Sequence, residues 1–143
     1  MRLVVTTPAG VVVDAEDVRH VRAEDKTGAF GLLPHHDAFL TVLAISVVTW
    51  RDRDDREHHV AVRGGVLKMA RDDRVEVATR DAQAGDDLGA LERAVVARYR
   101  AEAEAAAAAN REAARLEAAL VRRVLRYFHP DARVASVREE TLG

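Results

Sequence analysis

The chain changes character near Ala84–Asp87, and this change constrains its fold more than any other feature. Before that point, short runs of β-branched and apolar residues are separated by turn formers such as Pro8-Ala9-Gly10 and Gly64-Gly65. Many short strands with no helix between them predict an antiparallel β-sandwich of about ten strands. After that point the sequence is rich in alanine and charge, which predicts helix. We therefore expect an α+β protein with a β domain over residues 1–84 and a helical part over residues 85–143.

The helical part has two apolar stripes at spacings of three and four residues. Asp86 and Asp87 are suited to the N-terminus of its first helix. The first stripe consists of Leu88, Leu91, Val95 and Tyr99. The second stripe consists of Ala113, Leu116, Leu120, Val124 and Tyr127.

Two arrangements of these stripes remain open. The linking stretch "AEAEAAAAANREAA" favours one unbroken helix, because alanine is the best helix former. Its Asn110 also permits a hairpin that turns near Ala107–Arg111. Pro130 ends the helix, and the residues after it are expected to form a flexible tail.

Composition excludes several classes of protein. A net charge of -2 does not favour nucleic-acid binding, and the absence of cysteine excludes disulfides and thiolate zinc sites. No apolar run reaches the roughly 20 residues of a membrane-spanning helix, and the N-terminus lacks a signal-peptide pattern. We expect a soluble cytoplasmic protein that meets a membrane only through other proteins.

Two histidine pairs are the candidates for a metal site: His35-His36, followed by Asp37, and His58-His59. Neighbouring residues of a strand point to opposite faces, so His58 and His59 cannot both bind one ion if they lie on a strand. The sequence also lacks an HExxH spacing, a GxSxG serine and a phosphate-binding glycine loop. We therefore expect no catalytic residue, metal or cofactor, and a His-based metal protein remains an alternative.

"GAFGLLPHHDAFLTVL" is similar to the first signature of the epsilon subunit of F-type ATP synthases, and "VAVRGGVLKMARDDRVEVATRDAQAGDDL" resembles that family's second signature. Their order and separation also match, and the likeness extends from Leu3 to about Phe128. The sequence around "SVVTWR" looks closest to that of the alternate, N-type branch of the family, whose complexes often move sodium ions.

The resemblance implies a non-catalytic rotor subunit that links gamma to the ring of c subunits, on the cytoplasmic face of the cell (inner) membrane. The family fold is a β-sandwich followed by a helical hairpin. The loop after residue 27 would then dock on gamma and the c-ring, with His36 at the family's histidine position. His35 stands where the family usually has glycine, so the local turn is expected to differ. The implied docking residues are Gly28, Phe30, Gly31, Leu32, Leu33, Pro34 and His36.

The helical part is implied to regulate the enzyme. In the family the hairpin either lies folded against the sandwich or extends along gamma into the alpha/beta catalytic head, where a basic face inhibits ATP hydrolysis. Four arginines fall within about one-sixth of the helical circumference, and an ordinary solvated face is the alternative. These residues are Arg111, Arg115, Arg122 and Arg126.

Some bacterial relatives bind ATP through an [IL]-D-x-x-R-A motif at the start of the first helix. Here Gly89 replaces the aspartate and Arg93 is one residue out of register, so we expect no nucleotide binding. A stand-alone β-sandwich adaptor that self-associates through its helices is the remaining alternative function.

Overall fold

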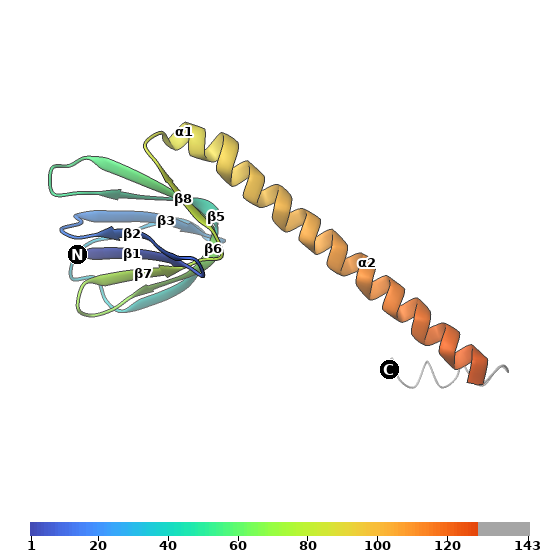
Figure 1. Cartoon of the computed structure of the whole chain (residues 1–143). Helices are drawn as coiled ribbons and strands as arrows, with labels where there is room; N and C mark the ends of the chain where they lie inside the picture. The colour runs from blue at the N-terminus through green and yellow to red at the C-terminus, as the bar shows by residue number, and fades with distance from the viewer. Residues whose placement is uncertain (129–143) are drawn as a thin grey trace. The chain divides into compact units, whose positions relative to one another are not determined.

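The computed structural model describes residues 1–128, which form eight strands followed by a helical segment (Figure 1). The predicted tail after Pro130 lies outside the described residues. The strands are β1 (Arg2–Thr7), β2 (Gly10–Ala15), β3 (His20–Asp25), β4 (Gly28–Leu32), β5 (Phe39–Arg51), β6 (Glu57–Met69), β7 (Arg74–Ala78) and β8 (Ala82–Gly85). The helical elements are α1 (Leu88–Ala90), the π-helix η1 (Leu91–Val96) and α2 (Ala97–Phe128).

The eight strands form one hydrogen-bonded sheet that folds into two layers (Figure 1). Along the sheet the order is β2-β1-β7-β6-β5-β3-β4, and β8 pairs with β6. β1 pairs with β7 in parallel, whereas the other pairs are antiparallel as predicted. The β-sandwich followed by helix is thus the architecture expected from the sequence.

The extent of β6 differs from the sequence prediction. Gly64 and Gly65 were expected to separate two strands, but both lie inside the 13-residue strand β6. Their φ angles of 66° and 110° bend the strand without ending it. Residues before the bend pair with β8, and residues after it pair with β7. β6 therefore serves both layers, which is one reason why eight strands replace about ten.

One hydrophobic core lies between the layers. Alternate residues of each strand point into it, as the pleat of a strand requires. Its fully buried members include Leu3, Val5, Val21, Val48, Val60, Val62, Leu67 and Val75.

The first turns of the helical segment pack on the outer face of the sheet. Asp87 caps the helix, since its side chain accepts a hydrogen bond from the Ala90 amide at 3.2 Å. Val95 and Tyr99 of the predicted stripe are buried around Ala61 of β6. Val96 is buried as well, because the wider π-turn brings it to the same face as Val95. Residues 1–102 accordingly form one compact unit.

Of the two arrangements that the sequence left open, the structure has one continuous helix, α2, rather than the hairpin that the resemblance implies. α2 passes through Ala107–Arg111 without a turn. The physical reason is that this stretch contains neither Gly nor Pro, and Asn110 alone does not offset the helix propensity of the alanines around it. A second compact unit begins at Ala103.

Candidate docking loop and regulatory helix

The predicted docking residues lie on β4 and on its connection to β5. Gly28, Phe30, Gly31 and Leu32 belong to β4, and Leu33, Pro34 and His36 follow it. β4 ends the strand order and pairs only with β3, so its other edge has no strand partner within residues 1–128. We call residues 28–36, which comprise β4 and the turn after it, the docking loop, after the role that the sequence predicts for them.

The two leucines of the docking loop have different environments. Leu32 is 1% exposed and belongs to the core between the layers. Leu33 is 58% exposed. Both leucines were predicted to dock, but the Leu32 side chain holds β4 in the sandwich. Leu33 is the leucine whose side chain is available to a partner.

A tight turn follows Leu33. The His36 amide donates to the Leu33 carbonyl at 3.2 Å, with Pro34 and His35 as the central residues. His35 has a φ of 66°, as the third residue of a type II turn requires. This conformation costs an ordinary residue about 1–2 kcal/mol, and glycine avoids the cost. The glycine that the resemblance implies at this position is therefore replaced by a histidine in the conformation that glycine prefers.

Asp73, in the turn between β6 and β7, binds this histidine. Its Oδ1 atom accepts a hydrogen bond from the His35 amide at 2.7 Å. Its Oδ2 atom lies 3.4 Å from His35 Nδ1. Bonds to an ionised acceptor are stronger than neutral ones, about 1.5–3 kcal/mol, which is enough to offset the strain of the turn.

His36 lies beside the turn on an aromatic cluster. Its Nδ1 atom is 2.7 Å from the Asp37 carbonyl oxygen, and its ring packs edge-on against Phe39. Phe39 in turn packs edge-on against Phe30 of β4 at 5.4 Å between ring centroids. The exposed His36 side chain thus has a defined position on the surface.

Asp25 holds the other end of the docking loop. Its carboxylate accepts a hydrogen bond from the Thr27 amide at 2.9 Å and another from the Thr41 hydroxyl of β5 at 2.9 Å. Hydrogen bonds from the Thr27 hydroxyl and from Thr41 lower the pKa of Asp25 below its ordinary value of 3.8. The loop is therefore fixed by a carboxylate at each end.

An exposed apolar patch that sequence reasoning missed lies on β5 and β6. Leu40 is 68% exposed, Val42 is 69% exposed, and Val66, the cross-strand partner of Val42, is 43% exposed. Counting alternate residues along β5 would have identified Leu40 and Val42, since Phe39, Thr41 and Leu43 occupy the other face of the strand. Neighbouring apolar side chains left in water are typical of a protein-binding surface.

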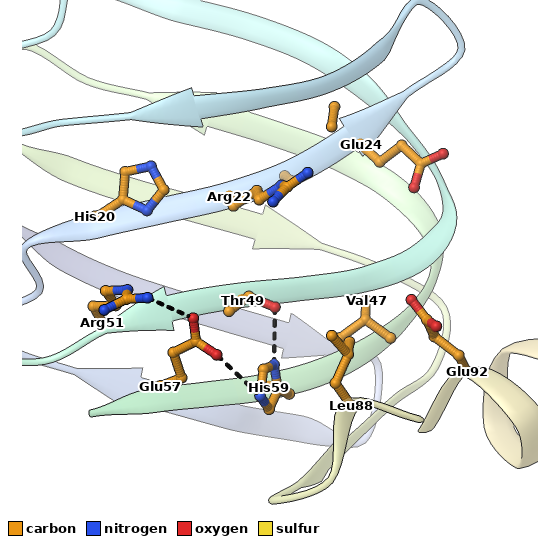
Figure 2. Close-up of a pocket in the computed structure, with 12 residues that line it drawn as sticks. His20, Arg22, Glu24, Val47, Thr49, Arg51, Glu57, His59, Leu88 and Glu92 are labelled. Atoms are coloured by element: carbon orange, nitrogen blue, oxygen red, sulfur yellow. Dashed lines mark hydrogen bonds and ion pairs between the residues drawn. The ribbon is translucent and has the colours of Figure 1, made fainter. Parts of the chain in front are cut away.

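A polar pocket of about 340 Å³ opens over β3, β5 and β6, and Leu88 and Glu92 also line it (Figure 2). Arg51 donates to Glu57 at 2.9 Å, and the other carboxylate oxygen of Glu57 lies 3.9 Å from His59 Nε2. His59 Nδ1 is 2.9 Å from the Thr49 hydroxyl (Figure 2). These four side chains contact one another in a chain that links β5 to β6.

His58 points to the opposite face of β6 from His59. Its ring stacks on Trp50 at 5.3 Å, and its Nε2 atom lies 2.8 Å from Asp52. His59 instead contacts Thr49. The alternation expected for a strand is confirmed, so this pair cannot bind one metal ion together. Within residues 1–128 no group of three or more His, Cys, Asp or Glu side chains is placed to hold a metal.

The four arginines of the predicted basic face lie exposed on α2. Arg111 forms an ion pair with Glu104 at 3.1 Å. Arg115, Arg122 and Arg126 make no ion pair with any described residue. The apolar stripe of the same helix is also exposed, from 50% to 81%, at Leu116, Leu120, Val124 and Tyr127.

The stretch compared with the ATP motif, residues 88–94, overlaps the π-helix. A π-turn takes one more residue than an α-turn, and η1 begins at Leu91, two residues before the out-of-register Arg93. The Arg93 guanidinium lies over Gly89: a Cβ atom there would be 2.9 Å from Arg93 Nη1. An aspartate at position 89 would therefore displace or bind this arginine.

Comparisons with known proteins assign the chain to a family. A sequence profile of the ATP synthase delta/epsilon chain beta-sandwich domain matches residues 1–85. ATP synthase epsilon chain 2 of Paraburkholderia xenovorans is 39% identical over 130 residues, which cover 91% of this chain and 94% of the relative. ATP synthase epsilon chain 2 of Cereibacter sphaeroides is 39% identical over 128 residues, covering 90% and 88%.

Two solved structures share the fold. One is a chain of the Euglena gracilis mitochondrial ATP synthase, with a TM-score of 0.55 and 19% identity, matched over 64% of this chain and 59% of that chain. The other belongs to the Tetrahymena thermophila mitochondrial ATP synthase central stalk and c-ring, with a TM-score of 0.50 and 16% identity, over 58% and 65%. No helix within residues 1–128 is long and apolar enough to cross a membrane. From the profile match and the two relatives, the chain belongs to the ATP synthase delta/epsilon chain family.

Proposed function

We propose that this chain is the epsilon subunit of the central stalk of an F-type ATP synthase. It is a non-catalytic rotor subunit that joins gamma to the ring of c subunits, so that ion movement is coupled to ATP synthesis or hydrolysis. The coupling ion is a proton or sodium. Its epsilon-chain relatives match over nearly their full length, which supports this assignment.

The observation that carries the proposal is the exposed side chain of Leu33 on a rigid turn. Leu33 is 58% exposed although it lies between the core residue Leu32 and a turn held by Asp73. An apolar side chain fixed in water on a braced loop is suited to a protein partner. We assign this docking loop to the c-ring and gamma, and the apolar patch of Leu40, Val42 and Val66 supplies further area for gamma.

We assign the docking function to residues 1–84 and a regulatory function to residues 85–143. Leu91, Val95, Val96 and Tyr99 would then anchor the regulatory part, since their side chains are buried on the sheet. The remainder of α2 carries an exposed apolar stripe and the arginine face. Those two faces are suited to a groove with acidic walls, which we identify with the alpha and beta subunits of the catalytic head.

The same proposal places the protein on the cytoplasmic face of the cell's inner membrane. It is peripheral there, held through gamma and the c-ring. No nucleic acid, nucleotide, metal or other cofactor takes part in its proposed role.

Reconstitution tests the function. Membrane vesicles whose ATP synthase lacks this subunit should hydrolyse ATP with poor ion pumping, and adding the purified chain should restore pumping per ATP hydrolysed. The chain should also co-purify with gamma. Self-association without binding to gamma would instead support the adaptor alternative and contradict the proposal.

A further inference from the structure

Two residues in left-handed backbone conformation meet at the docking loop. His35 has a φ of 66° and Asp73 a φ of 59°. Aspartate and histidine both tolerate this conformation better than most residues, but neither adopts it as freely as glycine does. His35 therefore needs support that a glycine at position 35 would not need.

Both carboxylate oxygens of Asp73 are directed to His35. One accepts from the His35 amide at 2.7 Å, and the other lies 3.4 Å from the imidazole Nδ1 atom. The amide of the third turn residue is not used by the turn's own hydrogen bond, which runs from His36 to Leu33. Asp73 thus satisfies a group that the turn leaves open.

The turn between β6 and β7, which carries Asp73, is itself held in place. The Asp73 carbonyl oxygen accepts a hydrogen bond from the Arg2 amide at 2.9 Å, at the start of β1. The Asp73 side chain is 24% exposed, whereas that of His35 is 91% exposed. The more enclosed and better fixed partner is therefore Asp73.

We propose that Asp73 is the positioning residue of the docking loop: its carboxylate holds His35 in the left-handed conformation and so presents Leu33 and His36 to the rotor partner. Without it, His35 would relax to a negative φ and the turn between Leu33 and His36 would open. This inference rests on the docking function proposed above and makes the docking loop depend on a residue 38 positions away in the chain.

The test removes the carboxylate without straining the β6–β7 turn. Asp73→Gly suits the φ of 59°, and Asp17→Gly is the matched control because Asp17, in the β2–β3 connection, has a φ of 54°. The intact purified protein is measured in two ways: amide hydrogen exchange at His36, and capture by the gamma–c-ring subcomplex. Asp73→Gly should speed His36 exchange and weaken capture about tenfold, the loss expected for one hydrogen bond to a charged group. Asp17→Gly should change neither.

Two further variants identify the cause. Asp73→Asn keeps an oxygen acceptor for the His35 amide and should recover most of the capture. His35→Gly in the Asp73→Gly background should restore capture, because glycine adopts the turn conformation unaided. Failure of His35→Gly to rescue, or unchanged exchange and capture in Asp73→Gly, would overturn the inference.

The inference and the proposed function fail in different ways. If Leu33→Asp abolishes capture while Asp73→Gly leaves exchange and capture at wild-type values, docking stands and the positioning role falls. If the wild-type protein is not captured at all, the docking function is contradicted. The positioning role is then contradicted with it, even if amide exchange at His36 is faster in Asp73→Gly.

Discussion

Gly65 lies directly against the backbone of Ala78 on the neighbouring strand β7. A Cβ atom at position 65 would be 2.1 Å from the Ala78 carbonyl oxygen, which is far inside the contact distance. The close approach occurs where β6 bends between the two layers. The position therefore requires glycine for both its φ of 110° and its contact.

Gly65→Ala should consequently destabilise the protein by at least about 2 kcal/mol, from backbone strain together with displacement of β7. Thermal unfolding should show a fall in Tm of roughly 8 °C or more. Gly10→Ala is the control, since Gly10 also has a positive φ, 138°, but a Cβ there meets nothing within 4 Å. Equal losses in the two variants would contradict a specific contact at Gly65.

Tyr99, in the first turn of α2, is fully buried against the sheet, and its hydroxyl has no hydrogen-bond partner within residues 1–128. Tyr99→Phe should therefore change the free energy of unfolding by less than about 1 kcal/mol, with a tendency to stabilise. Tyr99→Ala should cost about 3–5 kcal/mol, because it leaves a large cavity. Denaturant unfolding distinguishes the two. A large loss in Tyr99→Phe would mean that the hydroxyl is bonded after all.

The burial of Tyr99 also predicts that the protein loses stability at alkaline pH. Burial raises the pKa of the Tyr99 phenol above its ordinary value of 10.0, and the nearby charge of Asp81 adds to the rise. The unfolded chain then loses this proton more readily than the folded one, so the contribution is complete below about pH 10 and declines as pH rises through the folded pKa. The difference in unfolding free energy between wild type and Tyr99→Phe should grow between about pH 10 and pH 11. A constant difference would exclude burial of the phenol.

The arginine face of α2 should restrain ATP hydrolysis by the assembled enzyme. Replacing Arg115, Arg122 and Arg126 with Ala should leave the helix intact, since alanine favours helix, and should raise the hydrolysis rate. The increase should shrink at higher ionic strength, because exposed charges are screened. ATPase assays at low and moderate salt measure both effects.

Arg123→Ala is the matched control for Arg122→Ala, because one residue further on is about 100° round the helix and off the arginine face. Deleting Ala103–Gly143 should raise hydrolysis at least as much as the triple substitution, while the buried residues up to Tyr99 keep the first compact unit folded. If intact and truncated complexes hydrolyse ATP equally at both salt concentrations, the arginines form an ordinary solvated face.

The sequence predicted the parts of the fold that local patterns determine. The strands, the Asp87 cap and the buried stripe of Leu91, Val95 and Tyr99 follow from alternation, capping and helical spacing. Val96 could not be predicted in this way, because the π-turn that buries it breaks the spacing of three and four. The continuity of β6 was missed because Gly-Gly is compatible with both a turn and a bend.

The docking role of the candidate site remains a prediction. The resemblance supplied the docking loop, but the exclusion of Leu32 from its surface depends on which face of β4 meets the core. The contact between His35 and Asp73 joins residues far apart in the chain and could not be read from local sequence. The apolar patch at Leu40 was recoverable from alternation, provided that the inward face of β5 had been identified.

Capture of the purified protein by a gamma–c-ring subcomplex tests the central claim most directly. Leu33→Asp places a charge where the proposed interface is apolar, so capture should weaken by at least about tenfold, while the melting temperature stays near that of wild type because Leu33 is exposed. Leu33→Met, which keeps an apolar side chain of similar size, should bind as wild type does. Wild-type capture by a folded Leu33→Asp variant would contradict the docking of this loop on the rotor.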